Sequence, residues 1–257
     1  MTMPARGDLP ADQAGVAPGP AQAGARVGRN PITRARLKAM RADLRLEFGS
    51  MSELDPDRSE DGVTRWSLVA HATISDTDTD LRGEDATDTG VGLWTVPIFS
   101  MYGVALRLGD PHTNLTVWLD DESGDLAEFA ALLDGNDLDP GLVSPLTFGD
   151  DLVIVDHARL DPRWRGHGLG RLIIGLGLER HLPGARLFAA MPCPVELLEE
   201  HGQDRGHPEF VAGLASVRRT WESLGFTQAV GDIWVKDPGR VDGSKHLAAL
   251  RTRIHGR

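Results

Sequence analysis

Hydrophobic and polar positions along the chain follow two periods, one typical of strands and one typical of helices. Apolar residues alternate with polar ones over 66–74, and apolar stretches predict further strands at 92–108, 113–119, 152–160, 186–190 and near 227–236. Helical spacing predicts helices at 126–133, 169–181 and 210–224. Strands and helices are therefore mixed within residues 60–240, which predicts one α/β or α+β domain without internal repeats.

The two ends of the chain have different patterns. Residues 1–30 consist mainly of Ala, Gly and Pro, with few large apolar side chains, and we expect a disordered tail. Within 31–48 the residues Leu37, Met40, Leu44 and Phe48 recur every three or four positions, which predicts an amphipathic helix with arginines on its other face. Such a helix can pack on the domain, or contact a membrane surface or a partner helix. Residues 241–257 are expected to form a tail or a short helix.

Charge is distributed unevenly. The 257 residues include 38 acidic and 27 basic side chains, a net charge of −11, which argues against a general nucleic-acid binder. Residues 48–144 carry 20 acidic and 4 basic groups, whereas residues 145–257 carry 14 and 15. The acidic excess therefore lies in the middle of the chain.

Cysteine content and hydropathy indicate the compartment. Cys193 is the only cysteine and cannot form an internal disulfide, so a reducing, cytoplasmic setting is expected. No run of about 18 apolar residues predicts a membrane span, and no apolar segment near the N-terminus predicts a signal peptide.

Metal-binding patterns are incomplete in this sequence. Zinc spacing of Cys and His is missing, and the aspartates at 76, 78 and 80 are not followed by the glycine and glutamate that a calcium loop needs. We therefore expect no metal, and we interpret 75–92 as a solvated acidic loop.

One segment carries recognisable chemistry. Residues 152–170 read Leu-Val-Ile-Val-Asp-His-Ala-Arg-Leu-Asp-Pro-Arg-Trp-Arg-Gly-His-Gly-Leu-Gly, a buried strand followed by a glycine-rich turn that begins a helix. Amides at a helix N-terminus lack acceptors within the helix, and glycine allows an anion to approach the backbone closely. Arg171 and Leu172 stand where a P-loop needs Lys and Ser or Thr, and Arg171 also excludes the dinucleotide-binding glycine pattern.

The turn fits the pattern R-x-x-G-x-G with Arg165, Gly168 and Gly170, and Pro162 precedes it. About fifty residues later, Trp221-Glu-Ser-Leu-Gly-Phe226 ends a helix and is followed by Trp234-Val-Lys236. Together these motifs resemble the coenzyme A loop and the closing helix and strand of the GNAT superfamily of N-acetyltransferases. The resemblance covers residues 150–236.

The resemblance implies a fold, a co-substrate and a binding loop. The fold would be a central mixed, mostly antiparallel sheet flanked by helices and splayed at the strand that precedes the loop. Acetyl-CoA would bind with its pyrophosphate on the backbone amides of the turn, and an amide near Leu160 would polarise the thioester carbonyl. The residues of that turn are Arg165, Gly166, His167, Gly168, Leu169 and Gly170. The Arg165 side chain need only order the loop. A primary amine would then attack the acetyl group directly.

The closing helix departs from the family pattern. Trp221 stands where many members have the tyrosine that protonates the leaving thiolate, and an indole cannot supply that proton. The chain's single tyrosine, Tyr102, has no predictable position. Asp156, His157, or an acidic residue of 48–144 acting through water is the candidate general base. The alternative is a non-catalytic acyl-CoA-binding or regulatory module.

The charge of residues 48–144 is the only indication of which amine accepts the acetyl group. Because the acceptor side of this fold is built largely from its N-terminal half, the acidic segment favours a cationic amine, unless its charge only maintains solubility. A protein-interaction adaptor that uses the helix at 32–48 is a third interpretation. The oligomeric state is left open, and a homodimer is compatible with the sequence.

Overall fold

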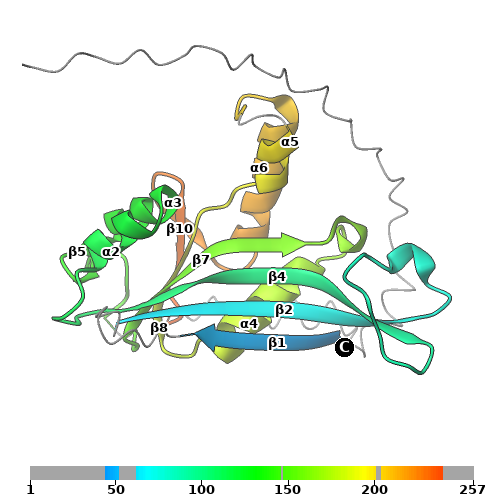
Figure 1. Cartoon of the computed structure of the whole chain (residues 1–257). Helices are drawn as coiled ribbons and strands as arrows, with labels where there is room; N and C mark the ends of the chain where they lie inside the picture. The colour runs from blue at the N-terminus through cyan, green and yellow to red at the C-terminus, as the bar shows by residue number, and fades with distance from the viewer. Residues whose placement is uncertain (1–43, 52–61, 146, 201–203, 240–257) are drawn as a thin grey trace, which may run out of the picture.

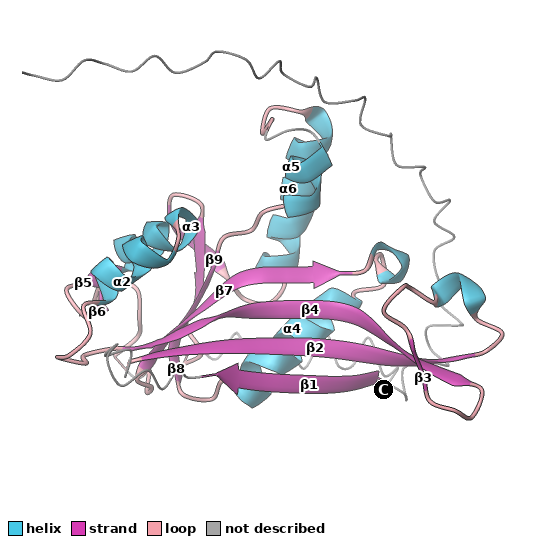
Figure 2. Cartoon of the chain, in the orientation of Figure 1, coloured by secondary structure: helices cyan, strands magenta, loops and turns pink. Residues whose placement is uncertain are grey.

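The structure is a computed structural model that describes residues 44–51, 62–145, 147–200 and 204–239. Its centre is one large twisted sheet, with helices on both faces (Figures 1 and 2). The chain is therefore a mixed α/β protein whose mostly antiparallel sheet is flanked by helices. The expected tails at 1–30 and 241–257 lie outside the described residues.

The sheet has the strand order β1-β2-β4-β7-β8-β10-β9, and the two-residue strand β3 pairs with β4. Among the described strands, only β7 and β8 pair in parallel, because the helix α4 (Leu169–His181) connects them, whereas the other neighbours are antiparallel. The strands are β1 (Leu44–Met51), β2 (Val63–Ser75), β3 (Thr87–Asp88), β4 (Leu93–Arg107), β7 (Asp151–Leu160), β8 (Ala185–Ala190), β9 (Thr227–Val230) and β10 (Ile233–Lys236). A separate hairpin joins β5 (Leu133–Asp134) to β6 (Asp137–Leu138).

Each face of the sheet has its own hydrophobic core. On one face, α4 (Leu169–His181) packs its apolar side chains against β2, β4 and β7, together with Trp221 from the end of α6 (Pro208–Glu222). On the other face, α2 (Leu115–Glu122) and α3 (Gly124–Ala127) cover one end of the same strands. Alternate residues of β7 enter different cores, so Val153 and Val155 contact the first and Leu152 and Ile154 the second.

The helix predicted over 31–48 is wrong in its last part, since residues from Leu44 onward form the edge strand β1. Leu44, Leu46 and Phe48 also alternate with polar residues, and they pack against the first core. Pairing with β2 satisfies the backbone N–H and C=O groups on the side that faces β2, so the period of two prevails over the helical spacing. The sheet thus begins before residue 60, where the sequence placed the start of the domain. Residues 31–43 lie outside the described residues.

The strand predicted over 113–119 is also wrong, because α2 occupies this segment. The Asn114 side chain caps the helix by accepting a hydrogen bond from the Val117 amide at 3.2 Å. Leu115 and Leu119, four positions apart, are both fully buried. Capping and helical burial outweigh the strand propensity of the threonine, valine and tryptophan residues between them.

The other predicted elements are confirmed with small changes. Residues 126–133 divide between the end of α3 and a 3₁₀ helix at Glu128–Leu132, with the final residue in β5. The single strand expected near 227–236 is a hairpin of β9 and β10 that turns at Gly231, where φ is 52°. The loop at 75–92 contains a 3₁₀ turn, Thr79–Leu81, and the short β3.

The register between β4 and β7 contains an irregularity that depends on Gly103. Gly103 pairs with Val155 and Tyr102 pairs with His157, so Asp156 is an extra residue on β7, a β-bulge. A Cβ placed on Gly103 would lie 1.9 Å from the Ile154 carbonyl oxygen and 3.0 Å from the Trp66 ring. Only glycine allows the two strands to approach this closely.

Gly103→Ala is expected to lower the free energy of unfolding by about 2–3 kcal/mol, because the methyl group must displace a backbone carbonyl rather than a flexible side chain. Gly124→Ala is the matched control, since a Cβ there meets no atom within 4 Å. Its stability should change by less than about 0.5 kcal/mol. Urea unfolding measures the free energy of unfolding of both variants. Equal stability of Gly103→Ala and wild type would show that a Cβ at residue 103 does not clash with the Ile154 carbonyl.

Candidate functional site

The candidate site lies where β7 separates from β8. The parallel pairing of these strands ends at Val155 and Ala190, next to the bulge at Asp156, whereas β7 continues to Leu160. The final residues of β7 remain paired with β4 on the opposite side. Among the described strands, none pairs with this last part of β7 on the side that β8 leaves.

Hydrogen bonds show which backbone groups face the open side. The Asp161 amide donates to the Ile98 carbonyl on β4 at 2.9 Å, while the Leu160 carbonyl accepts from Arg165 Nε at 2.9 Å. Since the N–H and C=O groups of one strand residue point to the same side, the Leu160 amide is directed away from β4. Leu160 thus presents its amide at the strand edge that β8 does not cover.

The glycine-rich turn follows directly from this strand end. Asp161 accepts a hydrogen bond from the Arg163 amide at 2.8 Å and caps a 3₁₀ turn, Pro162–Trp164, whose tryptophan is fully buried. Gly166 and Gly168 follow with φ of 86° and 74°, in the left-handed region that glycine adopts without strain.

Gly168 is the N-cap of α4, and the first hydrogen bond of this helix runs from the Leu172 amide to the Gly168 carbonyl at 3.2 Å. The amides of Leu169, Gly170 and Arg171 therefore have no acceptor within the helix and lie at its positive end.

The structure brings the sequence-predicted loop residues together with Leu160. A Cβ on Gly170 would lie 3.6 Å from the Leu160 side chain, and a Cβ on Gly166 would meet no protein atom within 4 Å. Leu169 contributes its side chain to the first core, so only its backbone is available to a ligand. His167 lies half-buried in the turn, immediately before the N-cap.

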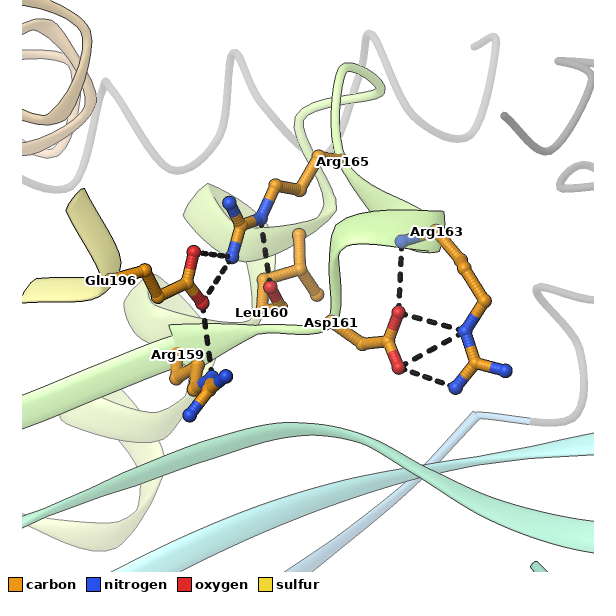
Figure 3. Close-up of polar contacts among 6 residues, drawn as sticks. All are labelled: Arg159, Leu160, Asp161, Arg163, Arg165 and Glu196. Atoms are coloured by element: carbon orange, nitrogen blue, oxygen red, sulfur yellow. Dashed lines mark hydrogen bonds and ion pairs between the residues drawn. The ribbon is translucent and has the colours of Figure 1, made fainter. Parts of the chain in front are cut away.

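Arg165 is held by two protein partners (Figure 3). Besides contacting the Leu160 carbonyl, its guanidinium donates to both carboxylate oxygens of Glu196 at 2.6 Å. Glu196 belongs to α5 (Val195–Glu200) and also pairs with Arg159 at 3.0 Å. Arg165 thus connects the turn to the end of β7 and to α5. Glu196 had no signal in the sequence, because only the fold places α5 beside the end of β7.

A second ion pair connects the turn to the acidic loop that follows β2. Arg163 donates to the Asp161 carboxylate through Nε at 3.0 Å, and to the Arg82 carbonyl at 2.7 Å (Figure 3 shows the pair). Burial raises the pKa of Asp161, but the hydrogen bonds and positive charge of Arg163 outweigh it, and the pKa lies below its ordinary value. This pair fixes the turn from the side opposite Glu196.

The two candidate general bases, Asp156 and His157, lie at the bulge of β7, a few residues before Leu160. Asp156 is exposed, although partial desolvation of its carboxylate raises its pKa. The charge of His157 lowers that pKa, while Asp125 on α3 and Glu122 on α2 raise it further. The imidazole of His157 is stacked on the ring of Tyr102, with centroids 4.9 Å apart. Tyr102 therefore lies beside the candidate bases, which the sequence could not determine.

Trp221 is a core residue. It is 5% exposed and contacts Phe226 edge to face, with ring centroids 4.7 Å apart. Its indole fills the first core between α6 and the sheet. Cys193 is half-buried, and burial raises the pKa of its thiol, which reduces its nucleophilicity at neutral pH.

No group of three or more His, Cys, Asp or Glu side chains in the described part of the chain is arranged to hold a metal ion. None of the described helices is long and apolar enough to cross a membrane. Comparisons of the chain with protein-family models, curated proteins and solved structures found no match.

The pKa of Asp161 is lowered and that of Asp156 is raised, so neutralising these two residues should change the free energy of unfolding in opposite directions. At pH 7 Asp161→Asn should lower the free energy of unfolding, because ionised Asp161 is stabilised by Arg163. Its folded pKa lies below the unfolded value of about 3.9, so this stabilisation is complete above that value and is lost as the pH falls through the folded pKa.

Asp156→Asn is the paired comparison, since the folded pKa of Asp156 lies above its unfolded value. Ionised Asp156 destabilises the fold at neutral pH, so the variant should be more stable than wild type at pH 7. This gain should vanish as the pH falls below about 3.9. Urea unfolding between pH 7 and pH 3 measures both differences, and a difference that does not vary with pH would contradict the assigned charges.

Proposed function

We propose that the protein is an N-acetyltransferase that transfers the acetyl group of acetyl-CoA to a primary amine by direct attack. One observation carries the proposal: the uncovered edge of β7 leads directly into a glycine turn and the N-terminus of α4. The sequence of this turn is the one that resembles the coenzyme A loop of the GNAT superfamily. A strand edge suits an extended amide-containing arm, and helix amides suit a pyrophosphate.

The residues present fit such a ligand. Gly166 leaves open space beside the turn, and the amides of Leu169, Gly170 and Arg171 can donate to phosphate oxygens. The Arg171 guanidinium lies next to Gly168, 3.0 Å from the position of a Cβ there, and adds positive charge at the same place. Arg159 and Arg165 are already paired with Glu196, so backbone groups carry most of the recognition.

The chemistry assigns a role to each part of the edge. The Leu160 amide would donate to the thioester carbonyl oxygen and stabilise the negative charge that develops on it. Asp156 or His157 would accept the proton that the amine must lose before its nitrogen attacks the carbonyl carbon. As the C–N bond forms and the C–S bond breaks, the thiolate leaves. Since a thiol has a pKa of about 8.5, solvent can protonate it without an acid at Trp221.

The acceptor is expected to be a cationic amine. The charges of Asp125 on α3 and Glu122 on α2 raise the pKa of Asp156, so two carboxylates add negative charge near this candidate base, one of them paired with Arg65. This charge would attract an alkylammonium group to the same face of the sheet. The alternative, a non-catalytic acyl-CoA-binding module, is favoured by the burial of Trp221, which removes the usual acid position.

Gly166→Leu should abolish stabilisation by acetyl-CoA. At a ligand concentration 100-fold above Kd, wild type should gain about 2.7 kcal/mol of stability, measured as a rise in Tm. Gly109→Leu is the matched control, because Gly109 has φ of 71° and likewise no atom within 4 Å of its Cβ position, but it lies far from the turn in the sequence and before α2. Both variants incur backbone strain, and only Gly166→Leu should lose the ligand-induced rise. An equal rise in both would contradict the assigned loop.

Thiol release in the presence of an amine panel tests turnover and acceptor class. Cationic diamines and basic peptides should show at least tenfold higher kcat/KM than neutral amines of equal size at low salt, and the ratio should fall as salt screens the carboxylates. Equal values at all salt concentrations would refute the cationic acceptor. Acetyl-CoA binding without thiol release from any amine would favour the non-catalytic module.

A further inference from the structure

Tyr102 contacts a candidate general base but has no role in the reaction proposed above. It is the chain's single tyrosine, lies on β4 and is 45% exposed. Its ring is nonetheless stacked on the imidazole of His157, with ring planes 10° apart and centroids 4.9 Å apart. The two residues are directly paired across β4 and β7.

The β-bulge creates this pair. Gly103 pairs with Val155, and the next pair is Tyr102 with His157, because Asp156 has no partner on β4. With a regular register Tyr102 would face Asp156, and His157 would point to the other side of the sheet. Val104 and Leu106, at two-residue steps from Tyr102, face the core beneath α2. The bulge therefore places the imidazole on the face that α2 and α3 flank, next to Asp156.

Stacking fixes an imidazole that would otherwise have few neighbours to orient it. A half-buried histidine on a strand can rotate about χ1 and χ2, and a parallel ring on the neighbouring strand restricts both rotations. None of the described residues forms a hydrogen bond with the Tyr102 hydroxyl, whereas the Tyr102 ring contacts His157. The ring is thus the part of Tyr102 that acts on the site.

We propose that Tyr102 is a positioning residue whose ring holds the His157 imidazole in the orientation that accepts the proton of the attacking amine. The proposal rests on the N-acetyltransferase function above and selects His157 over Asp156 as the general base. It also assigns the effect to the aromatic ring and not to the phenol hydroxyl.

Steady-state kinetics of the full chain with acetyl-CoA and the best amine of the panel test the proposal. Tyr102→Leu and Tyr102→Gln should each lower kcat about tenfold without changing KM for acetyl-CoA, because misorientation of a base affects the transition state. Tyr102→Phe keeps the ring and should stay within about twofold of wild type. Phe148→Leu, which removes an exposed aromatic ring outside the site, is the control and should leave kcat unchanged.

A double-mutant cycle determines whether Tyr102 acts through His157. His157→Ala should lower kcat about 100-fold, and adding Tyr102→Leu to it should have no further effect. In the NMR spectrum, the His157 imidazole resonances should move in Tyr102→Leu and stay near their wild-type positions in Tyr102→Phe. These spectra support or contradict the stack independently of turnover.

Three results would overturn the proposal. Equal losses in Tyr102→Phe and Tyr102→Leu would show that the hydroxyl acts, and additive losses in the double mutant would show that Tyr102 does not act through His157. Unmoved His157 resonances in Tyr102→Leu would show that the rings do not stack. Absence of thiol release by the wild-type protein would instead overturn the proposed function itself. The two failures are distinguishable, because the comparisons of Tyr102 variants require a wild-type protein that is active.

Discussion

The close approach of the Ile154 carbonyl to Gly103 is the contact on which the geometry of the site depends. Because residue 103 has no side chain, β7 can bulge at Asp156 while it stays paired with β4. The bulge coincides with the end of the β7–β8 pairing. The lack of a side chain at Gly103 is thus associated with three features of the site. They are the uncovered edge of β7, the shifted register between β4 and β7 after the bulge, and the stacking of Tyr102 on His157. Bulges are common next to functional sites for this reason, since they redirect side chains within an otherwise regular sheet.

Electrostatics divide the site into two parts. Around the glycine turn Arg165 and Arg159 pair with Glu196, and Arg163 pairs with Asp161, so backbone amides and the Arg171 guanidinium are the groups that remain for the proposed pyrophosphate. On the side of α2 and α3, Asp125 and Glu122 add negative charge near Asp156, and Glu122 is also paired with Arg65 at 2.8 Å. The proposed acetyl-CoA and the proposed cationic acceptor would therefore be attracted to different sides of the end of β7. Part of the acidic excess of residues 48–144 lies on the second of these sides, whereas the acidic loop at 75–92 contacts the turn through Arg163.

The sequence predicted elements well where local and tertiary preferences agree. The strand β7, the turn and α4 combine apolar runs, a capping Asp161 and glycines with positive φ, and all of these point to one structure. Predictions failed where the local sequence is compatible with both a strand and a helix. Leu44–Phe48 fits both a helix and a strand, and pairing with β2 decides for the strand. The segment at 113–119 has strand-forming residues, but the cap at Asn114 and the buried leucines decide for α2.

By itself, the sequence determined the mixed fold, the strand-turn-helix with its glycines and the cluster of acidic residues, because propensity, periodicity and local spacing are properties of neighbouring residues. Only the tertiary structure decided which distant side chains meet. Glu196 reaches Arg165 across 31 positions, and Tyr102 reaches His157 across a bulge that one residue creates. Strand register and helix packing fix such contacts through the burial of whole elements, and no local pattern encodes them.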